Sequence, residues 1–317
     1  MNRLSSFIPV LLLVLLCGLA FPLQADDGRF HNPQPVAIDG LPAGADGTPL
    51  STEEPFVSRD GRFLFFNSGE HENHKDLYYA VWRDGGWRYQ GEIGPHINTA
   101  KNVEGNPTMD ASYDFYYIDS AKQTMARSGH FNPLTGQLDG LHDVAGIPEK
   151  EIKPFRSFQG NMGVEISANG KTLYFSRATW KMNAFWLGRF IDSDIFFAQR
   201  RDSRFIYDEK QARTIMQNIN TRDMEYAASI SADGLELFFT RLAIDDLEKG
   251  RIHSQIMRAA RTDPAAPFGL PQPITAIGSS GFVEAPAIGP DGSELYYHKR
   301  EGKKFRLYKV VRSLRSR

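Results

Sequence analysis

Short apolar strands separated by turn residues recur along the chain, and one arrangement of them occurs five times. In each copy a short apolar strand leads into a tight turn, and a second strand rich in Leu, Tyr and Phe follows. Four turns contain Asp-Gly or Asn-Gly, which is typical of hairpins because glycine tolerates the positive φ that the turn requires. The second copy has Ser112 and Tyr113 there instead. The copies align without a gap at residues 55–68, 107–120, 164–177, 228–241 and 286–299.

Further strands are expected after these hairpins, which brings most repeats to three or four strands. Successive turns are 52 to 64 residues apart, slightly more than the ~40–50 residues of common propeller repeats. Four antiparallel strands at this spacing predict a β-propeller with enlarged loops. A β-sandwich is the alternative, but it gives no reason for five copies in phase. Third strands are expected at 76–82, 194–200, 255–261 and 306–312, and outer strands at 91–94, 214–216 and 271–278.

The fifth copy reaches the C-terminus without an outer strand, which would leave the edge of its blade unpaired. Residues 33–40 read like 271–278, the outer strand expected for the fourth copy. We therefore expect 33–40 to complete the last blade and close the ring. The sequence predicts an all-β fold, a five-bladed β-propeller of four-stranded antiparallel blades. We expect this fold to form a single domain over 26–317, with units that begin near residues 51, 103, 160, 224 and 282.

The composition agrees with this architecture and excludes several functions. Of the 317 residues, 41% are hydrophobic and 24% are charged, so the chain can bury a core. The net charge of −1 argues against a nucleic-acid partner, because phosphate binding needs an excess of Lys and Arg on one face. The sequence has neither a Gly-rich phosphate loop nor a Gly-x-Ser-x-Gly elbow. Phosphoryl transfer and this kind of serine hydrolysis are therefore disfavoured.

The first 25 residues have the pattern of a secretory signal peptide. Arg3 precedes an apolar run over 7–21, and Ala25 stands before a polar segment. We expect cleavage after Ala25 and an exported protein, periplasmic or secreted, with no membrane span after cleavage. An uncleaved anchor is one alternative. Lipidation at Cys17 is another, but the small residue that a lipoprotein signal needs before the cysteine is absent.

The repeat resembles a known family of exported propellers. It reads approximately Pro-x-hydrophobic-Ser-x-Asp-Gly before an aromatic-rich strand, most clearly at 58–61 and 231–234. This is similar to the WD40-like repeat PD40 of TolB-type propellers, and 97–107 and 219–225 resemble the linkers between their blades. The resemblance covers nearly all of the chain after residue 25. It implies a protein- or ligand-binding module of the bacterial cell envelope, although its motifs specify a fold rather than a chemistry.

The first candidate site comes from positions in the five aligned copies where acidic or basic residues recur. In a propeller, the loop entering the inner strand and the loop joining the second and third strands open on one face around the channel, where function is usually found. Carboxylates beside cations there can bind a polar or anionic ligand. The alternative is that these groups pair with one another and fix the blade packing. The acids are Glu53, Glu284, Glu104 and Glu225, and the cations are Arg177, Arg241 and Lys299.

The same four glutamates offer a catalytic alternative. Glycoside hydrolysis needs one carboxyl group as the acid and another as the base or nucleophile. Several sugar-cleaving families are five-bladed propellers, but this sequence shows no local signature of them. A glycan-active enzyme, a glycoside hydrolase or lyase, is therefore the second hypothesis, and it rests on fold analogy.

Histidines and aromatic residues form two further candidate sites. His71 and His74 stand among acids in 69–76, and His298 belongs to a unit that adjoins the first when the ring closes. They are candidates for a divalent metal, with a solvated polar loop as the alternative; no other cofactor is indicated. The long connection 178–193 carries Trp180 and Trp186, which either stack on a ligand or pack over the channel. We expect a monomer that binds an envelope protein or a glycan.

Overall fold

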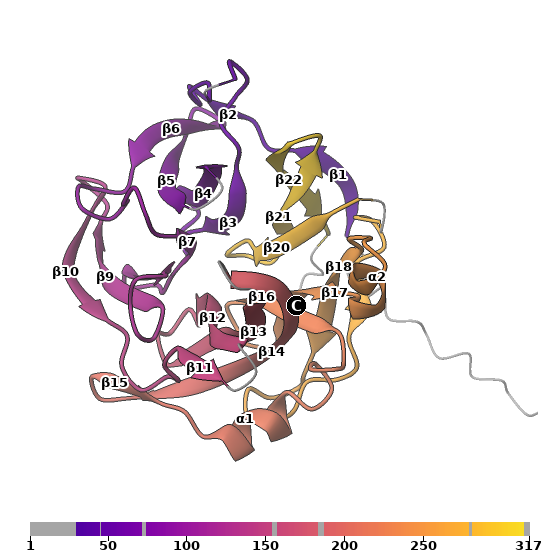
Figure 1. Cartoon of the computed structure of the whole chain (residues 1–317). Coiled ribbons are helices and arrows are strands. Elements are labelled where there is room, and N and C mark those ends of the chain that lie inside the picture. Colours follow the sequence, from indigo (N-terminus) through magenta and orange to yellow (C-terminus); the bar gives the residue numbers. More distant parts are fainter. Residues whose placement is uncertain are drawn as a thin grey trace, which may run out of the picture.

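The chain forms five small sheets arranged in a ring around a central channel (Figure 1). This computed structural model describes residues 30–44, 46–71, 74–153, 157–182, 187–278 and 281–313. Each sheet is one blade, and the first strand of each sequence repeat lies nearest the channel. The predicted five-bladed β-propeller is confirmed.

The first two blades follow the expected order closely. The first contains β2 (Ile38–Asp39), β3 (Glu53–Val57), β4 (Phe63–His71), β5 (His74–Arg83) and β6 (Gly86–Glu92). The second contains β7 (Glu104–Met109), β8 (Asp114–Asp119), β9 (Ala126–Asn132) and β10 (Gln137–Asp143).

The third and fourth blades carry the additions to the repeat. The third contains β11 (Glu151–Lys153), β12 (Ser157–Ile166), β13 (Thr172–Met182), β14 (Leu187–Arg201) and β15 (Arg204–Ile206). The fourth contains β16 (Met224–Ile230), β17 (Glu236–Leu242), β18 (Ser254–Ala260) and β19 (Gln272–Pro273). Two short helices are inserted, α1 (Glu209–Ile215) after the third blade and α2 (Ile244–Glu248) after β17. Among the described residues, no helix is long and apolar enough to span a membrane.

The last blade is completed from the opposite end of the chain. It contains β20 (Val283–Ile288), β21 (Glu294–Glu301) and β22 (Lys304–Val311), and β1 (His31–Pro35) pairs antiparallel with β22 as the outer strand (Figure 1). The expected segment 33–40 is nevertheless shared between two blades. β1 ends at Pro35, and β2 pairs in parallel with β6 of the first blade. The chain must pass from the last blade to the first at this point, so one segment supports both sides of the closure.

The Ser-x-Asp-Gly motif, with Asn in place of Asp in the third copy, folds three of the five hairpin turns. Ser58 Oγ donates to Asp60 Oδ1 at 2.5 Å and accepts from the Phe63 N–H at 2.9 Å. The same pair of bonds recurs at Ser167 and Asn169 and at Ser231 and Asp233. Gly61 supplies the positive φ of 73°. In the second copy Tyr113 takes this role with φ 68°, and its hydroxyl donates to Asp60 of the preceding blade.

A buried polar side chain within the second strand of four blades binds the next blade. It accepts a hydrogen bond from a backbone N–H in the neighbouring inner strand, next to a β-bulge. The N–H belongs to a residue with left-handed φ, between 49° and 53°. We call this contact the junction bond. Its four instances join Asn67 to Asn106 (3.4 Å), Ser176 to Ala227 (3.1 Å), Thr240 to Ala285 (2.9 Å) and His298 to Glu54 (2.9 Å).

A buried ion pair crosses the channel at the end opposite to the start of β3. Arg59, just after β3, places Nη2 3.0 Å from Glu165 Oε1 of the third blade. Its guanidinium also donates to the carbonyl oxygens of Met109 and Ile166, and Glu165 accepts from the Ile230 N–H. The channel between the inner strands leaves only about 10 Å³ for solvent. A ligand therefore has access to the ends of the channel and not to its interior.

Candidate functional site

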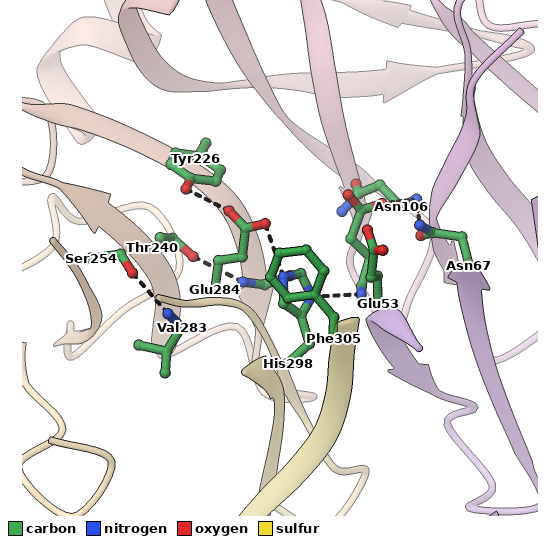
Figure 2. Close-up of polar contacts among 12 residues, drawn as sticks. Glu53, Asn67, Asn106, Tyr226, Thr240, Ser254, Val283, Glu284, His298 and Phe305 are labelled. Atoms are coloured by element: carbon green, nitrogen blue, oxygen red, sulfur yellow. Dashed lines mark hydrogen bonds and ion pairs between the residues drawn. The ribbon is translucent and has the colours of Figure 1, made fainter. Parts of the chain in front are cut away.

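Carboxylates gather where the inner strands begin, at the mouth of the channel (Figure 2). Glu53 and Glu54 start β3, and Lys75 from β5 places Nζ 2.8 Å from Glu53 Oε2 and 3.0 Å from Glu54 Oε1. Glu284 of β20 lies close enough to interact with the Lys75 charge. The side chains of Glu54, Glu284 and Lys75 are 20%, 16% and 27% exposed. We call Glu53, Glu54, Lys75, Glu284 and Tyr226 the mouth cluster.

Two donors from neighbouring strands hold Glu284 in its ionised form. Tyr226 Oη donates to Oε2 at 2.6 Å, and His298 Nε2 lies 2.9 Å from Oε1 (Figure 2). Because His298 Nδ1 accepts from the Glu54 N–H, the ring proton must be on Nε2, which donates to Glu284. Burial would raise the pKa of Glu284, but these hydrogen bonds and the charge of Lys75 hold it below its usual value.

Lys75 remains a cation despite its position. Burial would lower the pKa of Lys75, but the charges of Glu54 and Glu53 raise it above its usual value. Three carboxylates therefore share one ammonium group, so the mouth cluster is rich in hydrogen-bond acceptors and negatively charged. Such a site suits hydroxyl or amine donors and disfavours anions.

Glu104 and Glu225 do not belong to the mouth cluster, although they occupy one column of the repeat. Both are fully buried, with 0% exposure. Each carboxylate accepts from the backbone N–H and the hydroxyl of a nearby threonine, Thr99 or Thr221. Their contacts close the turns that lead into β7 and β16. Burial raises the pKa of Glu104 to about 7.

The three predicted cations are engaged away from the mouth cluster. Arg241 Nε lies 2.6 Å from Glu225 Oε1. Arg177 donates to the Glu149 carbonyl oxygen at 3.0 Å, and Lys299 lies over the Tyr308 ring at 5.7 Å. Their contacts match the packing alternative.

Sequence reasoning missed the cation that does reach the mouth. Lys75 stands in the segment 69–76, where the histidines drew attention instead. Tyr226 is the second missed member. It shares an alignment column with Glu53 and Glu284, so the repeat itself contained a signal for it.

The histidines have different surroundings. His298 is buried, and both of its ring nitrogens are used by Glu54 and Glu284 within the protein. His74 Nε2 lies 3.8 Å from Asp76 Oδ2, and the side chain of His71 lies outside the described residues. Within the described ranges, no group of three or more His, Cys, Asp or Glu residues is arranged to hold a metal ion.

The connection expected as a loop over 178–193 is largely a β-hairpin. β13 and β14 continue past the blade, with Thr179 paired to Asp192. The Trp180 ring packs against Phe158 of β12 at 5.5 Å, while Trp186 lies outside the described residues. Strand pairing extends here because the added residues of β12, β13 and β14 satisfy one another's backbone groups.

The chain is a five-bladed β-propeller. Comparison with known proteins supports this fold but assigns the chain to no family. No family model matches the chain, and no curated protein matches its sequence. A solved structure described as a glycoside hydrolase superposes with a TM-score of 0.57 at 10% identity, over 89% of this chain and 91% of that protein. The catalytic domain of a GH62 α-L-arabinofuranosidase from Coprinopsis cinerea gives 0.53 at 12% identity, over 90% and 97%.

TolB from Acinetobacter baumannii is also among the similar structures. Its TM-score is 0.45 at 13% identity, over 84% of this chain. The match spans 55% of the length of that TolB. All of these likenesses concern the fold.

Proposed function

We propose that this protein is an exported propeller that binds a neutral, hydroxyl-rich ligand, a glycan, at the mouth cluster. The observation that carries the proposal is the grouping of Glu53, Glu54 and Glu284 around Lys75, the one cation that the described residues bring to these carboxylates. Carboxylates are strong acceptors for sugar hydroxyls. The negative charge disfavours an anionic ligand, and the narrow channel leaves the mouth as the accessible surface.

The wider setting of this function belongs to the same proposal. The signal-peptide pattern of residues 1–25 supports export, and the PD40-like repeat supports a monomeric binding module of the bacterial cell envelope. We infer an envelope glycan as the partner because the mouth cluster offers acceptors for hydroxyl groups.

A glycan-cleaving enzyme is the second candidate, and two observations favour it. Similar folds include the GH62 arabinofuranosidase and the structure described as a glycoside hydrolase. At the mouth, Glu284 is held ionised and partly exposed, as a base or nucleophile must be. Glu53 or Glu54 would then have to act as the proton donor.

One pair of assays on one set of variants separates the two candidates. Binding is measured against immobilised neutral glycans, and cleavage is measured as new reducing ends from the same glycans. If the protein only binds, Glu284→Gln weakens glycan binding about tenfold, because one charge-assisted acceptor is lost. In that case neither the wild type nor the variant forms a cleavage product. For an enzyme, Glu284→Gln abolishes product formation while binding remains.

The matched control is Glu92→Gln, an exposed glutamate at the end of β6. This variant should leave both readouts unchanged. Thermal unfolding of each variant shows whether a loss reflects misfolding. A wild-type protein that neither binds nor cleaves any neutral glycan contradicts both candidates.

A further inference from the structure

A second cavity lies between the third and fourth blades, at the end of the strands opposite to the mouth cluster. Its lining includes the hairpin turn of each blade, near Asn169 and Asp233, together with α1 and residues 264–265. The volume is about 310 Å³, within the range of sites for small molecules. The cavity exists because α1 and the segment 264–265 extend beyond the regular strands at this junction.

Two cations in the lining have no carboxylate partner among the described residues. Arg261 donates to the Gly234 carbonyl oxygen at 2.9 Å and to Tyr174 Oη at 3.0 Å, and its guanidinium lies 4.1 Å from the centre of the Phe268 ring. These neutral contacts fix the guanidinium and leave its charge uncompensated. Lys171 is an exposed residue of the same lining. Asp233 is the acidic residue of the lining, so the cavity carries a net positive charge.

The rest of the lining divides into hydrogen-bonding and apolar parts. Carboxamides of Asn169, Gln199 and Gln211 offer both donors and acceptors. Phe197 and Ile215 supply apolar surface. A ligand complementary to this lining needs an anionic group, several hydroxyl groups and an apolar face.

We propose that this cavity binds a small hydroxylated organic acid of the uronic acid type. The carboxylate meets Lys171 and the guanidinium of Arg261, because charge-assisted bonds to carboxylates are the strongest available there. The hydroxyl groups bind the carboxamides, and the C–H face of the ring packs on Phe197 and Ile215. This site is distinct from the mouth cluster, whose negative charge disfavours such an acid.

Calorimetric titration of the protein with D-glucuronate tests the proposal. Glucose keeps the hydroxyl groups without the charge, and cyclohexanecarboxylate keeps the charge without the hydroxyl groups. We expect glucuronate to bind at least tenfold more tightly than either. Lys171→Gln should weaken glucuronate binding about tenfold, and Ala232→Trp, which fills the cavity from its lining, should abolish it.

The controls locate the binding. Lys210→Gln changes an exposed lysine of α1 outside the cavity lining and should leave the affinity unchanged, as should Glu284→Gln at the mouth. Absence of glucuronate binding to the wild type overturns the proposal. Glucose binding as tight as that of glucuronate and lost in Ala232→Trp also overturns it, because that glucose lies in this cavity and not at the mouth. So does glucuronate affinity that survives both Lys171→Gln and Ala232→Trp in folded variants. Loss of glucuronate binding in Glu284→Gln but not in Lys171→Gln places the acid at the mouth and also overturns it.

Discussion

At the scale of single residues, equivalent positions in the repeat have acquired different electrostatic roles. Glu104 and Glu225 occupy one alignment column and accept from equivalent threonines, Thr99 and Thr221. Glu225 also pairs with Arg241. The residue aligned with Arg241 in the second unit is Ser120, and Glu104 forms no ion pair within the described residues. A buried carboxylate without a counter-ion resists ionisation, which explains why burial raises the pKa of Glu104 to about 7.

This difference predicts a pH dependence of stability. Unfolded Glu104 titrates near its reference value of 4.5 and the folded residue near 7, so the folded state holds the proton more tightly. Its contribution to stability is therefore present below pH ~4.5 and is lost as the pH rises to ~7. In the wild type this loss amounts to up to about 3 kcal/mol in the free energy of unfolding between pH 4.5 and 8. Glu104→Gln should remove it.

Urea unfolding of both chains across this pH range measures the effect. Glu92→Gln, at an exposed site, serves as the control and should follow the wild type. A difference between Glu104→Gln and the wild type that does not change with pH contradicts the assignment.

At the scale of elements, the junction bond explains why the second strand of four blades carries a buried polar residue at the same position. Asn67, Ser176, Thr240 and His298 differ in chemistry but share one task, to accept the N–H of a left-handed residue in the next blade. The bulge in each inner strand turns this N–H out of its own ladder, so the neighbouring side chain must satisfy it. His298 has the same role in the fifth blade, where it accepts the N–H of Glu54.

Removing one acceptor tests the junction bond. Thr240→Val keeps the shape of the side chain but leaves the Ala285 N–H buried without a partner, which should lower the free energy of unfolding by about 1–3 kcal/mol. Thr172→Val is the matched control, because its hydroxyl bonds the half-buried Gln199 side chain rather than a buried backbone group. Denaturant unfolding at neutral pH measures both. An equal or smaller loss for Thr240→Val than for Thr172→Val argues against the role.

At the scale of the whole molecule, the ring is joined at its circumference and across its axis. β1 and β2 connect the last blade to the first. Across the axis, Arg59 of the first blade contacts Met109 of the second, Glu165 of the third and Ile230 of the fourth. One side chain thus couples four blades that are far apart in sequence.

Arg59→Met should therefore destabilise the whole propeller. It leaves the Glu165 carboxylate buried without its cation, and a loss of about 3–5 kcal/mol is expected. In the double variant Arg59→Met and Glu165→Gln, the uncompensated charge is gone and part of the stability should return. Calorimetric unfolding of the wild type, both single variants and the double variant gives the coupling energy. Additive losses would show that the ion pair does not act as a unit.

Local sequence patterns were enough to predict the repeated unit, the number of blades and the closing N-terminal strand. They were enough because strand alternation and turn residues act within about 15 residues. Which of the aligned acids meet depends instead on how the blades pack. His298 and Glu54 are 244 residues apart in the sequence, and no local pattern specifies how their blades face each other. The burial of Glu104 and Glu225, the approach of Lys75 and the cavity between the third and fourth blades likewise follow from contacts between neighbouring blades.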